Sequence, residues 1–274
     1  MSSRYAINII ENDDIPVELI EVPSSTQISG IKDKSDMLKG WVARTNYAKA
    51  LEMFSKALKN KEKLDKEKID TILSYAKDEY TRTSEDAKDI GKIVHNLIET
   101  DVKAQIDGRE IDFKADYDEK VLKGFFAFKD WEKDVGVKWL ESEQTVCQLD
   151  GLPYAGTLDL IGEIDGKIIV IDVKTSSGFY DDMILQVASY RNAREQMDGK
   201  YKVRDSQGEI HIFKVKKIKI DGMGILRLDK KTGLPEYKSY KEEKYQRSKK
   251  AFMNLLEFFY NEKTRRLKHN PAVY

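Results

Sequence analysis

One short segment constrains the fold of this chain more than any other: residues 156–174, with the dipeptide Asp165-Gly166 near its centre. An Asp-Gly pair between two apolar runs is typical of a type I′ turn, because both central positions of that turn require a positive φ. A hairpin closed at this turn places Asp159 directly opposite Asp172. The sequence therefore predicts two aspartates that face each other on neighbouring strands.

Opposed side chains on paired strands have Cβ atoms roughly 4.5–5.5 Å apart. Two carboxylates at this spacing repel each other unless a positive charge lies between them, and hard oxygen ligands suit Mg²⁺ or Mn²⁺. Lys174 follows Asp172 by two residues and therefore points to the same face of its strand. A buried Asp172–Lys174 ion pair without catalysis is the alternative interpretation, but it leaves Asp159 without a role.

The residues around these charges are apolar and mostly β-branched, which predicts a strand that is covered on both faces. Charges there need a partner or a function. In the helix expected next, Gln186 and Tyr190 are four residues apart and share a face. For an isolated Gln-x-x-x-Tyr, two ordinary surface residues would be the better interpretation. Beside a cation site, an amide and a phenol can hold phosphate or sugar oxygens.

Together, Asp159, Asp172-Val173-Lys174 and Gln186-x-x-x-Tyr190 resemble the core motifs of the PD-(D/E)xK nuclease superfamily. They are most similar to its RecB-like exonuclease branch, which includes CRISPR-associated single-strand exonucleases and many phage-encoded nucleases. Residues 89–99 are similar to the helix of that branch that contributes a metal-binding histidine, here His95.

The resemblance implies metal-assisted hydrolysis of DNA phosphodiester bonds, with one or two Mg²⁺ or Mn²⁺ ions as cofactor. It implies that Lys174 positions the nucleophile or stabilises the transition state. The implied metal ligands are His95, Asp159, Asp172 and the carbonyl of Val173, and the implied catalytic residues are Asp159, Asp172, Lys174, Gln186 and Tyr190.

Two other acids have open roles. Glu99 lies one turn after His95 and is a candidate to bind a metal-coordinated water. Glu143 precedes Asp159 and is either an additional acid of the site or an exposed strand charge. We assign no ligand role to the other histidines, His211 and His269.

The chain departs from the family pattern at three positions. Leu158 stands where a proline is common, and Asp172 replaces glutamate, which shortens the reach to the metal by one methylene. Cys147 is the only cysteine, so the chain cannot build the four-cysteine iron–sulfur cluster of several RecB-like nucleases. A lone cysteine also suits a reducing cytoplasm, here that of a bacterial or phage-infected cell.

The expected fold class is α/β: a restriction-endonuclease-like mixed sheet flanked by helices, with a largely helical N-terminal region. We expect a single domain over residues 1–274, with a mainly helical part at 1–135 and the catalytic sheet with its helices at 136–274. A second Asp-Gly pair predicts a hairpin of strands 211–219 and 224–228.

Charge limits the partners of the chain. The formal net charge is zero, so DNA must be contacted through local patches rather than through a global field.

No apolar run is long enough for a membrane span, and no signal-peptide pattern is present. The basic tail at 263–268 can contact a nucleic-acid backbone, although a solvated terminus is the more common case. We expect DNA as the partner, no membrane, and either a homo-oligomer or a recombination protein as a further possibility.

Three functional hypotheses follow. The leading one is a stand-alone DNA exonuclease, of phage type, in recombination, repair or end processing. The second is a structure-specific or restriction-type endonuclease. The third is a non-catalytic nucleic-acid-binding module with the same fold.

Overall fold

The computed structural model describes residues 5–11, 17–31, 35–111, 116–205 and 208–269. The chain divides into two compact units, one formed by residues 33–93 and the other by residues 1–32 and 94–274. We expected one domain whose helical part ends at residue 135. The division instead groups the helices after residue 93 with the sheets.

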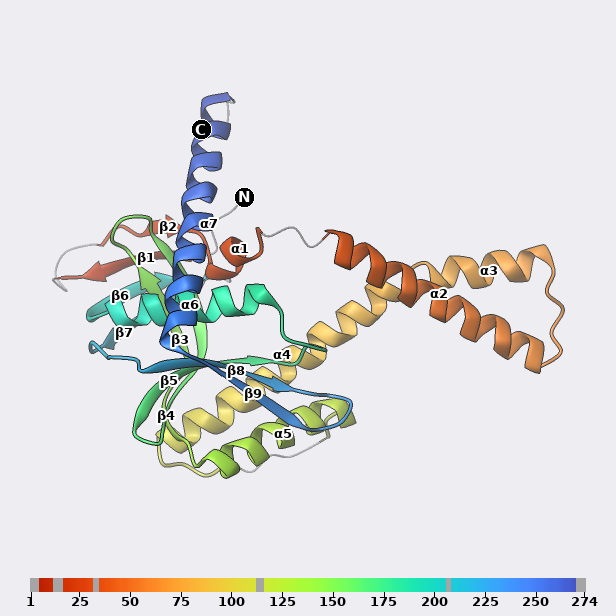
Figure 1. The fold of residues 1–274 in the computed structure, drawn as a ribbon, viewed down its shortest axis with the longest axis horizontal. Coiled ribbons are helices and arrows are strands. Elements are labelled where there is room, and N and C mark those ends of the chain that lie inside the picture. The colour runs from red at the N-terminus through yellow and green to blue at the C-terminus, as the bar shows by residue number, and fades with distance from the viewer. Residues whose placement is uncertain (1–4, 12–16, 32–34, 112–115, 206–207, 270–274) are drawn as a thin grey trace. The chain divides into compact units, whose positions relative to one another are not determined.

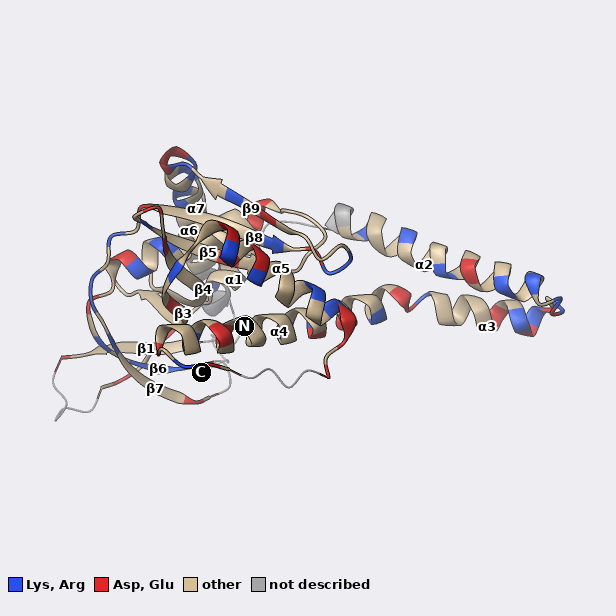
Figure 2. Ribbon diagram, turned by 90° about the horizontal axis from the view of Figure 1, so that it is seen from below, with Lys and Arg blue, Asp and Glu red and all other residues tan. Residues whose placement is uncertain are grey.

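The unit at residues 33–93 is helical. It contains α2 (Ser35–Lys59), α3 (Lys66–Ala76) and the first part of α4 (Glu79–Ile106) (Figure 1). Asp65 caps the N-terminus of α3, because its side chain accepts a hydrogen bond of 3.0 Å from the N–H of Lys68. Basic and acidic residues are interspersed along α2 and α3 (Figure 2), so neither helix carries charge of one sign only.

Two sheets form the framework of the larger unit. The central sheet has the order β3-β4-β5-β8-β9. It is mixed, because β5 and β8 are parallel while every other pair of neighbouring strands in it is antiparallel. Its strands are β3 (Lys138–Gln148), β4 (Tyr154–Ile164), β5 (Lys167–Lys174), β8 (Gly222–Leu228) and β9 (Pro235–Tyr240). The antiparallel second sheet has the order β2-β1-β6-β7, with β1 (Tyr5–Ile10), β2 (Ile20–Val22), β6 (Gly199–Arg204) and β7 (Ile210–Val215).

The hairpin of β4 and β5 closes where the sequence predicts. Asp165 and Gly166 both have a positive φ, of 50° and 72°. The paired residues of β4 and β5 run from Ile164–Lys167 at the turn to Leu160–Ile171, one pair before the two aspartates. The predicted register is therefore confirmed, although the backbone ladder does not extend to the acids.

Both predicted strands are present, as β7 and β8, but the second Asp-Gly pair does not join them in a hairpin, so that part of the prediction was wrong. β7 belongs to the second sheet, whereas β8 enters the central sheet parallel to β5. Asp221 marks the start of β8: its N–H donates to the carbonyl of Ile168 (2.7 Å), and its carboxylate accepts from the N–H of the same residue (3.0 Å). An Asp-Gly pair can thus begin a strand as well as close a turn.

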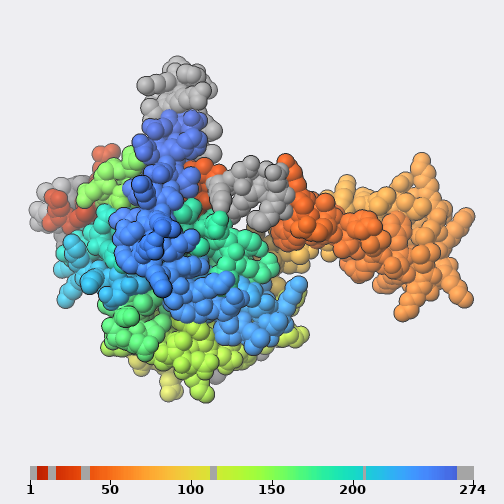
Figure 3. All heavy atoms as spheres, in the orientation of Figure 1, coloured from red at the N-terminus to blue at the C-terminus, as the bar shows by residue number. Residues whose placement is uncertain are grey.

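Helices contact the central sheet from both sides (Figure 1). α6 (Asp181–Gln196) packs on β3, β5 and β8, and α1 (Ser25–Ser29) and α7 (Glu242–His269) pack on α6. In Figure 3 the C-terminal segments, drawn in blue, lie over the middle of this unit, and green and yellow-green segments are exposed below them. α5 (Glu119–Val135) packs on β8 and β9. In the described part of the chain, no helix has the length and apolar character needed to cross a membrane.

This arrangement confirms the α/β class, with a mixed central sheet and a largely helical N-terminal region. β5 lies between β4 and β8, and Val170, Ile171 and Val173 on it are at most 1% exposed. The prediction of a strand that is covered on both faces is therefore confirmed, and its charged end is held by a rigid framework.

Candidate metal centre

Three side chains from separate elements meet at one end of the β4–β5 hairpin. They are His95 on α4, Glu143 on β3 and Asp159 on β4, and one ligand atom of each lies within 4.8 Å of the others. The Nδ1 atom of His95 is 3.9 Å from Oδ2 of Asp159. Sequence reasoning placed His95 and Asp159 in one site and left the role of Glu143 open.

The register of β3 explains how Glu143 reaches this cluster. Ser142 pairs with Leu160 and Gln144 pairs with Leu158, so Glu143 stands opposite Asp159. Its φ of 49° lies in the left-handed region, which is uncommon for residues other than glycine. Such backbone conformations cluster at functional sites, where the surrounding structure holds them.

Asp172 and Lys174 lie beside this cluster at the end of β5. Asp172 is 1% exposed, and its Oδ2 is 2.7 Å from Nζ of Lys174. Apart from this ion pair, neither carboxylate oxygen has a hydrogen-bond partner in the described part of the chain. Because buried polar atoms are nearly always satisfied, the carboxylate oxygen that Lys174 does not contact requires an explanation beyond packing.

Asp159 is held by the neighbouring strand. Its Oδ2 accepts a hydrogen bond of 2.6 Å from the N–H of Val173. Burial raises the pKa of Asp159, although Lys174 and this N–H act in the opposite direction. The hairpin thus fixes one oxygen of this carboxylate.

Burial also raises the pKa of the other two acids. It raises the pKa of Glu143 to about 8, and the charges of Asp159 and Glu99 add to this effect. It raises the pKa of Asp172 to about 6, with Lys174 opposing the shift and Asp159 adding to it. Each acid resists ionisation because burial disfavours its charge and, to a smaller extent, because a neighbouring carboxylate repels it. A bound cation would oppose both effects.

The histidine is suited to ligation. Burial lowers the pKa of His95 to about 4, and the charge of Lys174 acts in the same direction. A hydrogen bond to the backbone of Val173 opposes these effects and places that backbone next to the ring. His95 is therefore neutral near pH 7, the form in which an imidazole binds a metal.

Lys174 keeps its charge in this environment. Burial alone would lower the pKa of Lys174, but the charges of Asp172 and Asp159 raise it above its ordinary value. A permanent cation next to the acids can neutralise a phosphate or orient a water.

Gln186 and Tyr190 on α6 form a hydrogen-bonded pair. Nε2 of Gln186 donates to Oη of Tyr190 (2.7 Å) and to Oγ1 of Thr26 (3.2 Å). Burial raises the pKa of Tyr190 well above its usual range, and the charges of Asp172 and Asp159 add to this. The phenol is therefore protonated, and it lies close enough to Asp172 and Asp159 for their charges to raise its pKa.

Thr26 was not predicted from the sequence. It lies on α1, which begins with a capping box: Ser24 Oγ accepts from the N–H of Gln27, and Gln27 Oε1 accepts from the N–H of Ser24. Ser25 Oγ donates to the carbonyl of Ala155 (3.2 Å) and ties α1 to β4. The capping box predicts from the sequence that a helix begins here, but it does not predict that this helix contacts Gln186.

Gly156 provides the space in which α1, α6 and β4 meet. A Cβ atom at this position would lie 2.5 Å from Cε1 of Tyr190 and 3.0 Å from Oγ of Ser25. We expect Gly156→Ala to lower the free energy of unfolding by about 1–3 kcal/mol, since rigid neighbours would have to shift. Thermal denaturation followed by circular dichroism measures this effect.

Gly40→Ala in α2 is the matched control, because a Cβ there meets nothing nearer than Nη1 of Arg44 at 3.6 Å. Alanine in a helix interior should raise stability by about 0.5–1 kcal/mol. Equal shifts of the melting temperature in both variants would contradict the packing of Gly156 described above.

The donor set fits a divalent cation. A neutral imidazole and two carboxylates converge, and the buried carboxylate of Asp172 next to them has Lys174 as its polar partner. Carboxylate oxygens suit Mg²⁺ and Mn²⁺, the ions implied by the family resemblance. Asp172 is not one of the three converging side chains, so the structure brings Glu143 rather than Asp172 into closest contact with His95 and Asp159.

A second group of possible metal ligands lies on the β6–β7 hairpin. It contains Asp205, Glu209 and His211, and Nε2 of His211 is 2.9 Å from Oδ2 of Asp205. Glu209 and His211 are exposed, and exposed acidic groups of this kind are common without an ion.

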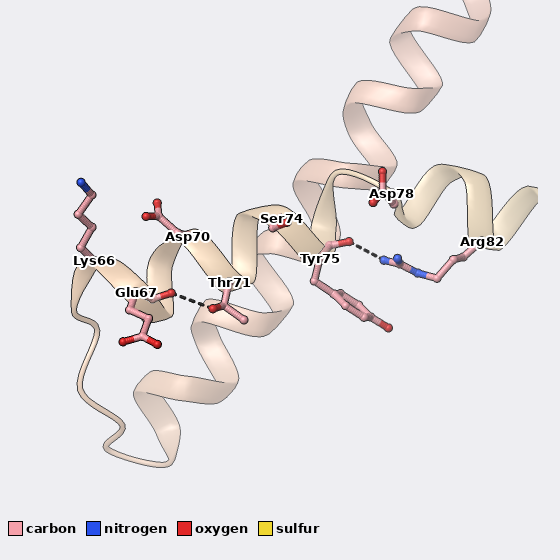
Figure 4. Close-up of a pocket in the computed structure, with 8 residues that line it drawn as sticks. All are labelled: Lys66, Glu67, Asp70, Thr71, Ser74, Tyr75, Asp78 and Arg82. Atoms are coloured by element: carbon pink, nitrogen blue, oxygen red, sulfur yellow. Dashed lines mark hydrogen bonds between the residues drawn. The ribbon is translucent and has the colours of Figure 1, made fainter.

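A cavity of about 860 Å³ lies in the helical unit, along α3 (Figure 4). Arg82 stacks over the ring of Tyr75 at 3.9 Å and donates to its carbonyl (2.6 Å). The cavity is lined by none of the predicted site residues, and its lining consists of Lys66, Glu67, Asp70, Thr71, Ser74, Tyr75, Asp78 and Arg82.

Comparison with known proteins leaves the family open. No protein-family model matches the sequence, and no curated protein matches it. Among the solved structures that match, SSO0001 is similar with a TM-score of 0.28 and 13% sequence identity. The match covers 49% of this chain and 58% of SSO0001, so the chain spans little more than half the length of that protein. A likeness this low carries no argument about function.

Proposed function

We propose that this protein is a Mg²⁺- or Mn²⁺-dependent deoxyribonuclease that hydrolyses phosphodiester bonds in DNA. One observation carries the proposal: the buried carboxylate of Asp172, whose polar partner is the cation Lys174, lies beside a cluster of three side chains that could hold a metal ion. Glu143, Asp159 and Asp172 share this site with one cation, Lys174, so the positive charge does not balance the three acids and the arrangement favours a bound cation. The resemblance to the PD-(D/E)xK nucleases supports the same chemistry.

His95, Glu143 and Asp159 would hold the cation, with Asp172 and the carbonyl of Val173 next to it. When bound, a divalent cation lowers the pKa of water and neutralises charge on the attacked phosphate. Lys174 then orients the nucleophile or stabilises charge on the phosphate.

Gln186 and Tyr190 would orient the scissile phosphate. Both are donors, and the raised pKa of Tyr190 keeps its proton available to a phosphate oxygen.

The test is digestion of end-labelled single- and double-stranded DNA with Mg²⁺ or Mn²⁺. We expect the wild type to degrade DNA and Lys174→Ala to be inactive. Lys123→Ala removes a lysine that forms an exposed ion pair with Glu119 and should match the wild type. Digestion by Lys174→Ala at the wild-type rate would contradict the assigned role of this lysine.

Within this class, the resemblance favours an exonuclease in recombination, repair or end processing. Closed circular DNA separates this activity from an endonuclease, since an exonuclease needs an end. Cutting of closed circles would favour the structure-specific or restriction-type endonuclease instead.

A non-catalytic nucleic-acid-binding module is the second candidate, because the Lys174–Asp172 ion pair satisfies the lysine without any reaction. This function would take precedence if the wild type degraded neither DNA nor RNA and Asp172→Ala left every measured property unchanged.

A further inference from the structure

We propose that a cavity of about 440 Å³ next to the metal centre binds the sugar–phosphate backbone of the DNA strand beyond the cleaved bond; this inference rests on the proposed function. The cavity belongs to the same compact unit as the metal centre. Its lining consists of Asn96, Glu99, Thr100, Lys103, Arg109 and Ile111.

Helix α4 links the cavity to the metal centre. Asn96, Glu99, Thr100 and Lys103 follow one another at helical spacing and therefore share one face of α4, directly after His95. The cavity is also in electrostatic contact with the centre, because Glu99 raises and Lys103 lowers the pKa of Glu143. A strand held at the metal centre would continue along this face.

The end of α4 brings a second cation to the cavity. Gly108 has a φ of 66°, and its N–H donates to the carbonyl of Gln105, while the N–H of Arg109 donates to the carbonyl of Ala104. These two bonds form a Schellman motif, which reverses the chain over the last turn of the helix. Arg109 is thereby held next to Lys103 although it lies outside the helix.

Both cations are available to a phosphate. Lys103 is 2.6 Å from Glu99 and Arg109 is 2.8 Å from Asp107, and their side chains are 47% and 62% exposed. Exposed ion pairs of this kind contribute little to stability, so a phosphate can replace the carboxylate at small cost.

The chemistry of the lining fits a nucleic-acid backbone better than a small apolar ligand. Arginine, lysine and amide groups are the usual partners of phosphate and sugar oxygens, and they carry no base specificity. The cavity supplies one of each, in Arg109, Lys103 and Asn96. It should therefore hold the strand in place without reading its sequence.

The test uses the full chain and a fluorescently labelled single-stranded oligonucleotide, with Ca²⁺ replacing Mg²⁺ to slow cleavage. Binding is measured by anisotropy over a range of KCl concentrations for the double variant Lys103→Gln/Arg109→Gln. Loss of two phosphate contacts should weaken binding about tenfold and reduce the slope of log K against log[salt] by about 1.4. In steady-state cleavage with Mg²⁺, KM should rise by about the same factor, while kcat should change much less.

The matched control is Lys123→Gln/Arg247→Gln, which removes the same charge from two exposed ion pairs, with Glu119 and Glu243. The charge-retaining variant Lys103→Arg should bind as the wild type does. Equal binding and an equal salt slope in the cavity variant and the control would overturn the inference. Wild-type protein that binds DNA through the cavity but never cleaves it would instead overturn the proposed nuclease function.

Discussion

Asp172→Asn is expected to lower the single-turnover rate of DNA hydrolysis on the order of 10³-fold. Asparagine has nearly the same shape but no charge, so packing is preserved while the negative charge between the cluster and Lys174 is lost. Lys174 then loses the partner that is 2.7 Å away and whose charge raises its pKa. Rates on end-labelled DNA with saturating Mn²⁺ measure the effect.

Asp205→Asn is the control for this substitution. It removes the same charge from the exposed group on the β6–β7 hairpin and should leave the rate unchanged. A loss of activity in Asp205→Asn, together with wild-type rates in Asp172→Asn, would place the catalytic metal at the group of Asp205, Glu209 and His211 instead.

Without metal, the protein is expected to become less stable as the pH rises from about 6.5 to about 8. The pKa of Asp172 is raised from 3.8 to about 6, and that of Glu143 from 4.5 to about 8. An acid whose pKa is raised on folding stabilises the fold fully below its unfolded pKa and loses this contribution as the pH rises through the folded value. For these two acids alone the window extends from about pH 4 to about pH 8. His95 acts in the opposite direction below pH 6.5, because its pKa is lowered from 6.5 to about 4 in the folded protein, so the net loss of stability is expected between about pH 6.5 and about pH 8.

The expected decrease of the melting temperature in EDTA across this window is on the order of 5 °C. Mn²⁺ binds the ionised form and should restore more stability at the upper end of the window than at the lower end. The double variant Glu143→Gln/Asp172→Asn should lose both the pH dependence and the response to Mn²⁺. A stability in EDTA that rises with pH in the wild type would contradict the shared burial of these acids.

The sequence predicted the part of the site that local rules control. The positive φ of Asp165 and Gly166 follows from the turn type, and the turn then fixes the register of β4 against β5. Strand alternation placed Lys174 on the same face as Asp172, and in the structure Nζ of Lys174 lies 2.7 Å from Oδ2 of Asp172. These inferences needed only neighbours in the sequence.

Contacts between distant elements could not be predicted. Glu143 reaches Asp159 because β3 pairs with β4 in one particular register and because its backbone adopts a left-handed conformation. Thr26 reaches Gln186 only after α1 docks on β4. The hairpin proposed around Asp221 failed for the same reason, since its parallel partner β5 lies far away in the sequence.

Side-chain exposure along α5 shows a similar limit. The aromatic residues at positions 125, 126, 128 and 131 are typical of a core-facing helix, and Phe128 and Trp131 among them are buried, at 0% and 5% exposure. Phe126 in the same stretch is 58% exposed, because consecutive residues of a helix point in different directions.

The central claim is that His95, Glu143 and Asp159 hold a divalent cation. An anomalous difference map from crystals soaked in MnCl₂ tests this most directly, because it locates the ion without reference to activity. The account predicts a peak within about 2.5 Å of His95 and at least one of the two carboxylates. The same map should show no peak in crystals of the double variant Glu143→Gln/Asp159→Asn. A map with no peak at this cluster, or with a peak only at Asp205 and His211, would contradict the account.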